Sequence, residues 1–170
     1  MLAGYFYVQH FNHNSIMNQI GLNEEKVTLL VDKLNTLLAN YTVFYINVRG
    51  YHWNIKGEHF FELHVKFEEL YNNAVLKIDE IAERIVTLGA TPLHTYTDYL
   101  TRSAITEQKN VTSGKECVIQ VRDSLRQLLT LQREILELSA DAGDEGTNSL
   151  MSDYIREEEK LVWMYSAYLG

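Results

Sequence analysis

The stretch "GYHWNIKGEHFFELH", residues 50–64, holds three of the six histidines of the chain, together with a tryptophan and two acidic residues. Gly57 separates two runs of apolar residues that are each spaced as in an α-helix, so the stretch predicts a turn between two helices. Imidazole is also the commonest protein ligand for transition metals. Two interpretations follow: a turn packed with ordinary core aromatics, or a metal site.

Helical periodicity continues outward from this turn in both directions. The predicted helices are a first that begins after the N-cap Asn23, a second over residues 58–88, a third over 113–141 and a fourth over 147–169. Residues 91–111 are long for a bundle turn and are predicted to contain a short helix over residues 98–102. Four helices with a long middle crossover predict an all-α, ferritin-like four-helix bundle, whose second and third helices run parallel. A generic up-and-down bundle is the alternative.

Composition bounds the class of protein. The 170 residues fit one domain, and they contain no apolar run of about 18 residues that would span a membrane. Cys117 is the only cysteine, so an internal disulfide is excluded and a reducing, cytoplasmic compartment is expected. The formal net charge is −8, and no Lys or Arg precedes Lys26 or follows Lys160. This charge argues against binding DNA, because phosphate contacts need clustered cations.

The beginning of the chain is predicted to lie outside the main domain. Residues 1–20 are interpreted as an N-terminal arm, and residues 21–170 as the bundle domain. The arm lacks the basic start and the cleavage pattern of a signal peptide. It is either a disordered extension or a wrongly assigned start, in which case Met17 is the true first residue. His10 and His13 in the arm are interpreted as exposed polar residues.

The candidate metal ligands are His52, His64, Asp79 and Glu83. No Glu in the chain has a His three residues later, so the usual Glu-x-x-His ligands of a di-iron bundle are absent. Asp79 and Glu83 are four residues apart, which places both carboxylates on one helix face. Carboxylates with imidazoles suit iron, manganese or zinc. However, His64 and Asp79 are fifteen residues apart on one helix, roughly 22 Å along its axis, so they cannot share a metal within one chain.

A second copy of the chain could bring the histidines and the carboxylates together. A two-fold partner that runs antiparallel would bring the histidines of one chain to the carboxylates of the other, and would close two identical sites. The alternative is that the four side chains never meet and that each has only a structural role.

The residues around the turn also carry a family resemblance. The sequence "NVRGYHWNIKGEHFFELHVKFEEL", followed by "DEIAERIVTLG", resembles the Dps family of mini-ferritins, the DNA-protection-during-starvation proteins. The matching elements are His52-Trp53-Asn54, Gly57 to Phe60, Leu63-His64, Asp79-Glu80 and Ala82-Glu83-Arg84. The resemblance extends over roughly residues 22–169.

The resemblance implies a hollow shell of twelve subunits, built from two-fold dimers, in which iron is oxidised at the dimer interfaces. It implies two iron ions per site, with ligands His52 and His64 from one subunit and Asp79 and Glu83 from its partner. Glu68, one turn after His64, would bind the second ion. Trp53 would be an electron donor or radical sink, or else a packed aromatic. His59 and His94 match no ligand position of the family, and we interpret them as ordinary polar or packed residues.

The resemblance also implies a route for iron into the shell. The turn "DAGDEG" aligns with the region that lines three-fold pores in the family, which makes pore candidates of Asp141, Asp144 and Glu145. Acidic residues in a pore would concentrate cations. The alternative is that this turn is an ordinary solvated polar turn. Asp153, in the last helix, is a further candidate.

The resemblance thus predicts a ferroxidase that oxidises Fe(II) with hydrogen peroxide, stores ferric mineral and so protects DNA. The residues alone do not distinguish peroxide from oxygen. One alternative is a nucleoid protein that binds DNA directly, although such family members usually carry Lys-rich tails, which are absent here. The other is a structural helical oligomer without metal activity.

Overall fold

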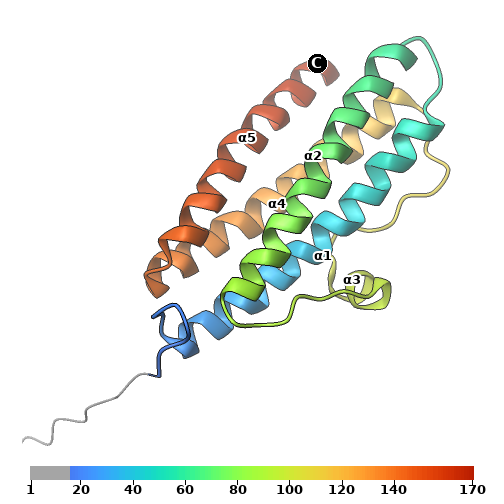
Figure 1. The fold of residues 1–170 in the computed structure, drawn as a ribbon. Helices are drawn as coiled ribbons and strands as arrows, with labels where there is room; N and C mark the ends of the chain where they lie inside the picture. Colours follow the sequence, from blue (N-terminus) through green and yellow to red (C-terminus); the bar gives the residue numbers. More distant parts are fainter. Residues whose placement is uncertain (1–15) are drawn as a thin grey trace, which may run out of the picture.

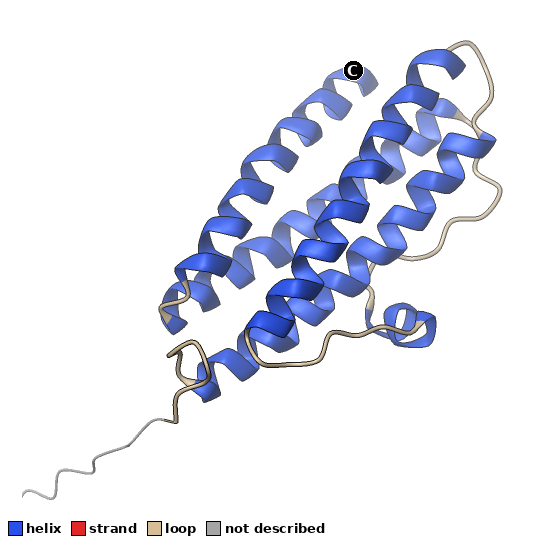
Figure 2. Cartoon of the chain, viewed as in Figure 1, coloured by secondary structure: helices blue, strands red, loops and turns tan. Residues whose placement is uncertain are grey.

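The computed structural model describes residues 16–170, and this part of the chain contains five helices and no strand (Figures 1 and 2). The helices are α1 (Glu24–Asn54), α2 (Phe60–Thr87), α3 (Tyr96–Arg102), α4 (Gly114–Ala142) and α5 (Glu145–Leu169). The long helices form two antiparallel hairpins, α1–α2 and α4–α5, which confirms the predicted all-α bundle. His10, His13 and most of the predicted arm lie outside the described residues. Over residues 16–170, no helix has the length and apolar character needed to cross a membrane.

Side-chain caps mark the starts of four of the five helices, all except α2. Asn23 Oδ1 accepts a hydrogen bond from the backbone N–H three residues later at 3.1 Å, and Ser113 Oγ does the same at 3.5 Å. Among the long helices, two starts differ from the prediction by two residues. Helix α2 begins at Phe60 rather than at residue 58, and α5 begins at Glu145 rather than at residue 147. The earlier start of α5 follows from Asp144, whose side chain caps that helix.

The crossover between α2 and α4 runs alongside α1 (Figure 1). Asn40 Oδ1 accepts a hydrogen bond from the backbone N–H of Ile105 at 3.0 Å, and Asn47 Oδ1 accepts one from that of Gln108 at 2.9 Å. These buried asparagines are seven residues apart, hence on one face of α1. Helix α3 begins at Tyr96, two residues earlier than predicted. The crossover returns the chain to the end of the bundle where α2 begins, so α2 and α4 run parallel, as predicted.

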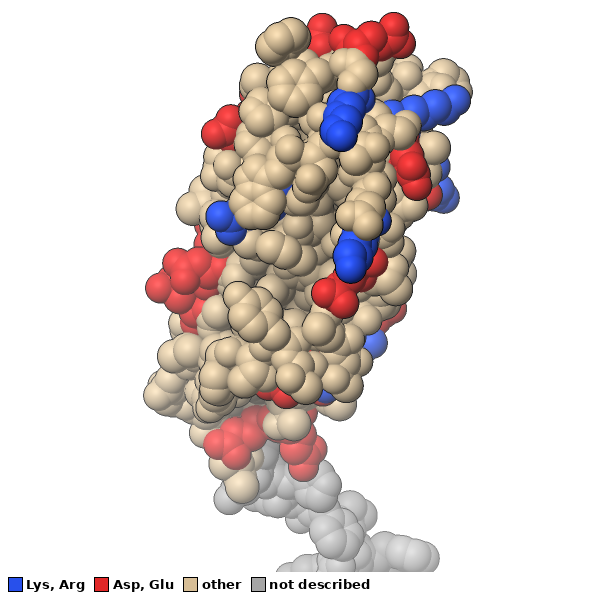
Figure 3. Space-filling view, turned by 90° about the vertical axis from the view of Figure 1, so that its right-hand side faces the viewer, with Lys and Arg blue, Asp and Glu red and all other residues tan. Residues whose placement is uncertain are grey.

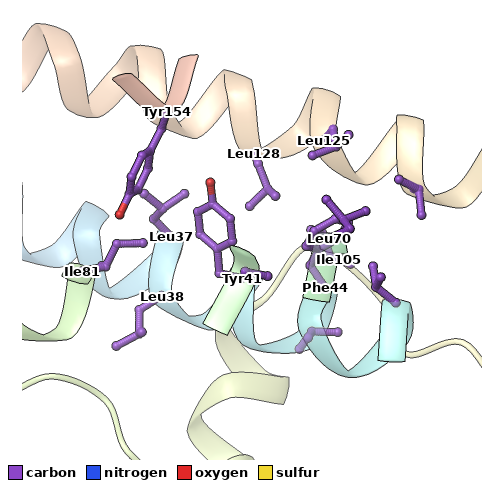
Figure 4. Packing of buried hydrophobic residues seen from close by; sticks show 14 of the residues in the cluster. Leu37, Leu38, Tyr41, Phe44, Leu70, Ile81, Ile105, Leu125, Leu128 and Tyr154 are labelled. Carbon is purple, nitrogen blue, oxygen red and sulfur yellow. The ribbon is translucent and has the colours of Figure 1, made fainter. Parts of the chain in front are cut away.

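Apolar side chains from all four long helices fill the centre of the bundle (Figure 4). Leu37 of α1 lies towards Ile81 of α2, whereas Phe44 lies beside Ile105, which closes the core from the crossover. Each fully buried side chain of this size contributes about 1.5–3 kcal/mol of stability. The core holds the long helices as rigid rods, and so fixes where surface residues lie along them.

One buried carboxyl group interrupts this core. Glu158 of α5 is 2% exposed, accepts a hydrogen bond from the Tyr41 hydroxyl, and accepts another from Gln132 Nε2 at 2.8 Å. Gln132 Nε2 also donates to the Tyr41 hydroxyl oxygen at 2.8 Å, whereas Gln132 Oε1 has no hydrogen-bond partner. Burial raises the pKa of Glu158 from 4.5 to about 7, although the Tyr41 hydrogen bond and the charge of Lys77 oppose the rise.

We expect Glu158→Gln to stabilise the protein at pH 8 and to have little effect at pH 5. The carboxyl ionises near pH 4.5 in the unfolded chain but near pH 7 in the folded one, so it destabilises the native state increasingly between these values and fully above pH 7. The amide of glutamine does not ionise, so the variant avoids this loss of native-state stability, which is on the order of 3 kcal/mol above pH 7. The stability of both proteins is measured by unfolding with heat or urea at pH 5 and at pH 8. A stability difference between variant and native protein that is equal at the two pH values would contradict the prediction.

Candidate metal centre

The two histidines on either side of the turn lie face to face. His52 is in the last turn of α1, and His64 is in the second turn of α2. Gly57 reverses the chain between them, with a φ of +112° that residues with a Cβ rarely adopt. The ring centroids are 3.8 Å apart, with 18° between the ring planes. The α1–α2 turn therefore brings together the pair of histidines that the sequence predicts at one end of the hairpin.

Reciprocal hydrogen bonds orient these rings. His52 Nδ1 lies 2.8 Å from the carbonyl oxygen of His64, and His64 Nδ1 lies 2.8 Å from the carbonyl oxygen of His52. Because a carbonyl oxygen only accepts, each Nδ1 carries a proton, which leaves Nε2 as the ring nitrogen that can bind a metal. Metal-binding histidines are commonly oriented by such a bond from the other ring nitrogen. The pair thus offers two imidazole Nε2 atoms as ligands.

Aromatic side chains surround the pair. Phe60 stacks on His64 with 5.0 Å between ring centroids, and Tyr71 meets His52 edge-on at 5.3 Å. Sequence reasoning missed Tyr71, although it follows His64 by seven residues and so shares its helix face. Trp53 is 59% exposed, and the Arg49 guanidinium lies 4.7 Å from its ring centroid. In the single chain, Trp53 is therefore a surface residue beside the histidines and is not packed in the core.

The carboxylates lie far along the same helix. Asp79 and Glu83 are exposed, and α2 is unbroken from Phe60 to Thr87, so the roughly 22 Å between His64 and Asp79 is preserved. Glu68 is exposed one turn after His64. Within residues 16–170, no three His, Cys, Asp or Glu side chains are grouped to hold a metal. Within one chain, the histidine pair and the two carboxylates are therefore separate groups, and the structure does not bring them together.

Apolar side chains share the exposed face of α2 with these carboxylates. At 100° per residue, Val65, Leu76 and Val86 fall on the same side of α2 as Asp79 and Glu83. The side of the molecule along α1 and the crossover is mostly uncharged, with a few Lys and Arg side chains on it and most acidic groups towards its edges (Figure 3). We call the following exposed residues the α1–α2 face: Ile46, Trp53, Val65, Val75, Leu76 and Val86. Apolar residues exposed in such number mark an interaction surface.

The predicted pore residues have different environments. Asp144 is 3% exposed, pairs with Arg84 at 2.5 Å and accepts a hydrogen bond from the Thr147 backbone N–H at 3.0 Å. These contacts give Asp144 a structural role at the start of α5. Asp141 and Glu145 are exposed, and Asp141 pairs with Lys26 at 3.1 Å.

The remaining candidates lie apart from the histidine pair. Asp153 is exposed on α5 and pairs with Arg156 at 2.8 Å. His59 meets the Tyr168 ring at 5.8 Å between centroids, and His94 Nδ1 lies 2.9 Å from the carbonyl oxygen of Pro92. Neither histidine contacts His52 or His64 in the hydrogen bonds and ring contacts of the described residues.

Comparisons with known proteins agree with this architecture. The ferritin family model, which describes a ferritin-like domain, matches residues 31–170. The DNA protection during starvation protein of Porphyromonas gingivalis is 40% identical over 153 residues, 90% of this chain and 96% of the relative. General stress protein 20U of Bacillus subtilis is 35% identical over 141 residues, 83% of this chain and 97% of the relative.

A solved structure gives the same result. The crystal structure of a Dps protein from Vibrio cholerae O1, a member of the ferritin-like diiron-carboxylate proteins, matches with a TM-score of 0.89 and 54% identity. The match covers 91% of this chain and 97% of that chain. The family model and the relatives thus span nearly the whole bundle, including the histidine pair and the carboxylates of α2. The chain is a ferritin-like protein and belongs to the Dps family of stress-protection proteins.

Proposed function

We propose that this protein oxidises ferrous iron with hydrogen peroxide at sites shared between two subunits, and stores the product as ferric mineral inside a hollow dodecamer. One observation carries the proposal. The histidine pair presents two Nε2 atoms at one end of α2, while Asp79 and Glu83 lie exposed on the same helix, too far away to join them. Each half-site is prepared for a metal and incomplete without a second copy.

A two-fold axis across the α1–α2 face would complete both sites at once. With the two α2 helices antiparallel, the carboxylates of one subunit would face the histidines of the other. Burial of the apolar residues of this face would supply the association energy, at about 25 cal/mol for each Å² removed from water. The same contact would thus stabilise the dimer and exclude water from the iron.

Iron is the substrate of the proposed reaction. Two Fe²⁺ ions reduce one peroxide: 2 Fe²⁺ + H₂O₂ + 2 H⁺ gives 2 Fe³⁺ + 2 H₂O. Both electrons leave together, so no hydroxyl radical forms. The residues His52, His64, Asp79 and Glu83 would hold the ions, with Glu68 at the second position. Trp53, exposed next to His52, would supply an electron when only one ion is bound.

The charged residues of the chain bear on how Fe²⁺ enters the shell and on whether DNA binds. Of the pore candidates, Asp141 and Glu145 are exposed and so placed to attract Fe²⁺, whereas Asp144 would shape the turn through its pair with Arg84. The net charge of −8 argues against direct DNA binding, so protection of DNA would come from removal of iron and peroxide.

The direct test is an anaerobic titration of the Fe²⁺-loaded protein with hydrogen peroxide, followed by ferric absorbance, for the native protein and Asp79→Asn. We expect fast oxidation at about two Fe²⁺ per peroxide, and a loss of at least ~10-fold in rate for the variant, because one carboxylate ligand becomes a neutral amide. Oxygen in place of peroxide identifies the preferred oxidant. Rates equal to the protein-free control for the native protein would contradict the proposal.

A further inference from the structure

Lys77 places a buried cation inside the bundle. Its side chain is 3% exposed. Lys77 Nζ donates to Glu157 Oε2 at 2.5 Å and to Asn73 Oδ1 at 2.7 Å, and it lies 4.9 Å from the ring centroid of Tyr154. Lysine is among the residues least often buried, and it is buried only with partners. A lysine on the surface contributes to solubility, but a buried lysine does not, so the burial of Lys77 needs another explanation.

The surroundings of this ammonium group resemble a metal site. Glu157 and the buried Glu158 are consecutive on α5, and Lys77 is close enough to Glu158 to affect its ionisation. Gln132 Oε1 is fully buried and has no hydrogen-bond partner. Tyr41, Lys77, Gln132 and Glu158 come one from each long helix. Helical bundles bind divalent metals with carboxylates and neutral oxygens from facing helices. Here Glu158 is buried, whereas the Glu157 side chain that pairs with Lys77 is 44% exposed.

We propose that the Lys77 ammonium takes the place of a metal ion in the bundle interior, and so keeps divalent ions out of it. A tethered positive charge that already contacts Glu157 would repel an incoming cation strongly, because the interior screens charge weakly. The charge of Glu157 would then be neutralised without any bound metal. The consequence rests on the proposed function: iron is left to bind at the subunit interface, where Asp79 and Glu83 are exposed.

Removal of the lysine side chain tests this directly. The parent for the test is Asp79→Asn/Glu83→Gln, in which the interface carboxylates are already absent. Binding of Mn²⁺ is measured in the assembled protein through the loss of its free-ion electron paramagnetic resonance signal. Adding Lys77→Ala is expected to create about one new Mn²⁺ site per chain, whereas adding Lys77→Arg is expected to create none. Sites elsewhere, such as Asp141 and Glu145, are common to all three proteins and cancel in the comparison.

A fourth protein identifies the ligands. Glu158→Gln, added to the Lys77→Ala protein, is expected to abolish the new site, because the site loses its most buried carboxylate. If Lys77→Ala is unfolded without metal, Mn²⁺ is expected to restore its helical circular dichroism. Equal Mn²⁺ binding with Lys77 and with Lys77→Ala, or failure of Mn²⁺ to restore an unfolded variant, would overturn the proposal. Because the interface ligands are absent throughout, the result is independent of whether the native protein oxidises iron.

Discussion

Two inactive variants are expected to regain iron oxidation when their subunits are mixed. One variant, Asp79→Asn/Glu83→Gln, keeps the histidines, and the other, His52→Ala/His64→Ala, keeps the carboxylates. Each homodimer would contain only broken sites. A mixed dimer would contain one intact site, formed by the histidines of the first subunit and the carboxylates of the second, and one site that lacks both halves. Random exchange makes about half of all dimers mixed, so about a quarter of the native activity is expected.

The measurement is the rate of peroxide-driven ferric absorbance after the two variants are produced together and purified through a different tag on each. Two copies of the same variant, purified in the same way, are the control, and they are expected to stay inactive. Mixed preparations without activity, with assembly intact, would show that the two half-sites do not meet across subunits. Activity in either homodimer would show that one half-site is enough.

The sequence predicted the fold well because helical signals are local. The N-caps Asn23 and Ser113 act at the predicted helix starts. The start of α5 was placed two residues late, because "DAGDEG" was interpreted as a loop, although the position of Asp144 suits an N-cap. Only the three-dimensional structure shows that Arg84, sixty residues earlier, neutralises it.

The candidate site was predictable in its spacing but not in its detail. Helix geometry alone separates His64 from Asp79 and points to two chains. The reciprocal hydrogen bonds of His52 and His64 could not be foreseen, because they depend on how the turn brings two backbone carbonyls to two rings. Lys77 did leave a signal, since it falls in the buried stripe of α2 between Ala74 and Ile81. A charge in such a stripe indicates a buried partner, which the sequence does not identify.

The second large effect is expected from a residue that binds no metal. Leu76 is 64% exposed in the single chain and lies on α2 three residues before Asp79, within the α1–α2 face. If a second copy covers this face, Leu76→Glu would bury a carboxylate without a partner, which costs several kcal/mol at each of the two equivalent positions. We therefore expect Leu76→Glu to separate the subunits and to lower the rate of iron oxidation by at least ~10-fold, although every ligand remains.

Light scattering reports the assembly, and ferric absorbance reports the oxidation, on the same samples. Gln127→Glu, which adds the same charge to the exposed side of α4, is the matched control, and it is expected to change neither. Because association depends on concentration, raising the concentration of Leu76→Glu should recover assembly and oxidation in parallel. A variant that dissociates yet oxidises iron at the native rate would show that one chain is sufficient. A variant that stays assembled and active would place the second subunit elsewhere, since a buried carboxylate at Leu76 could not be tolerated without loss.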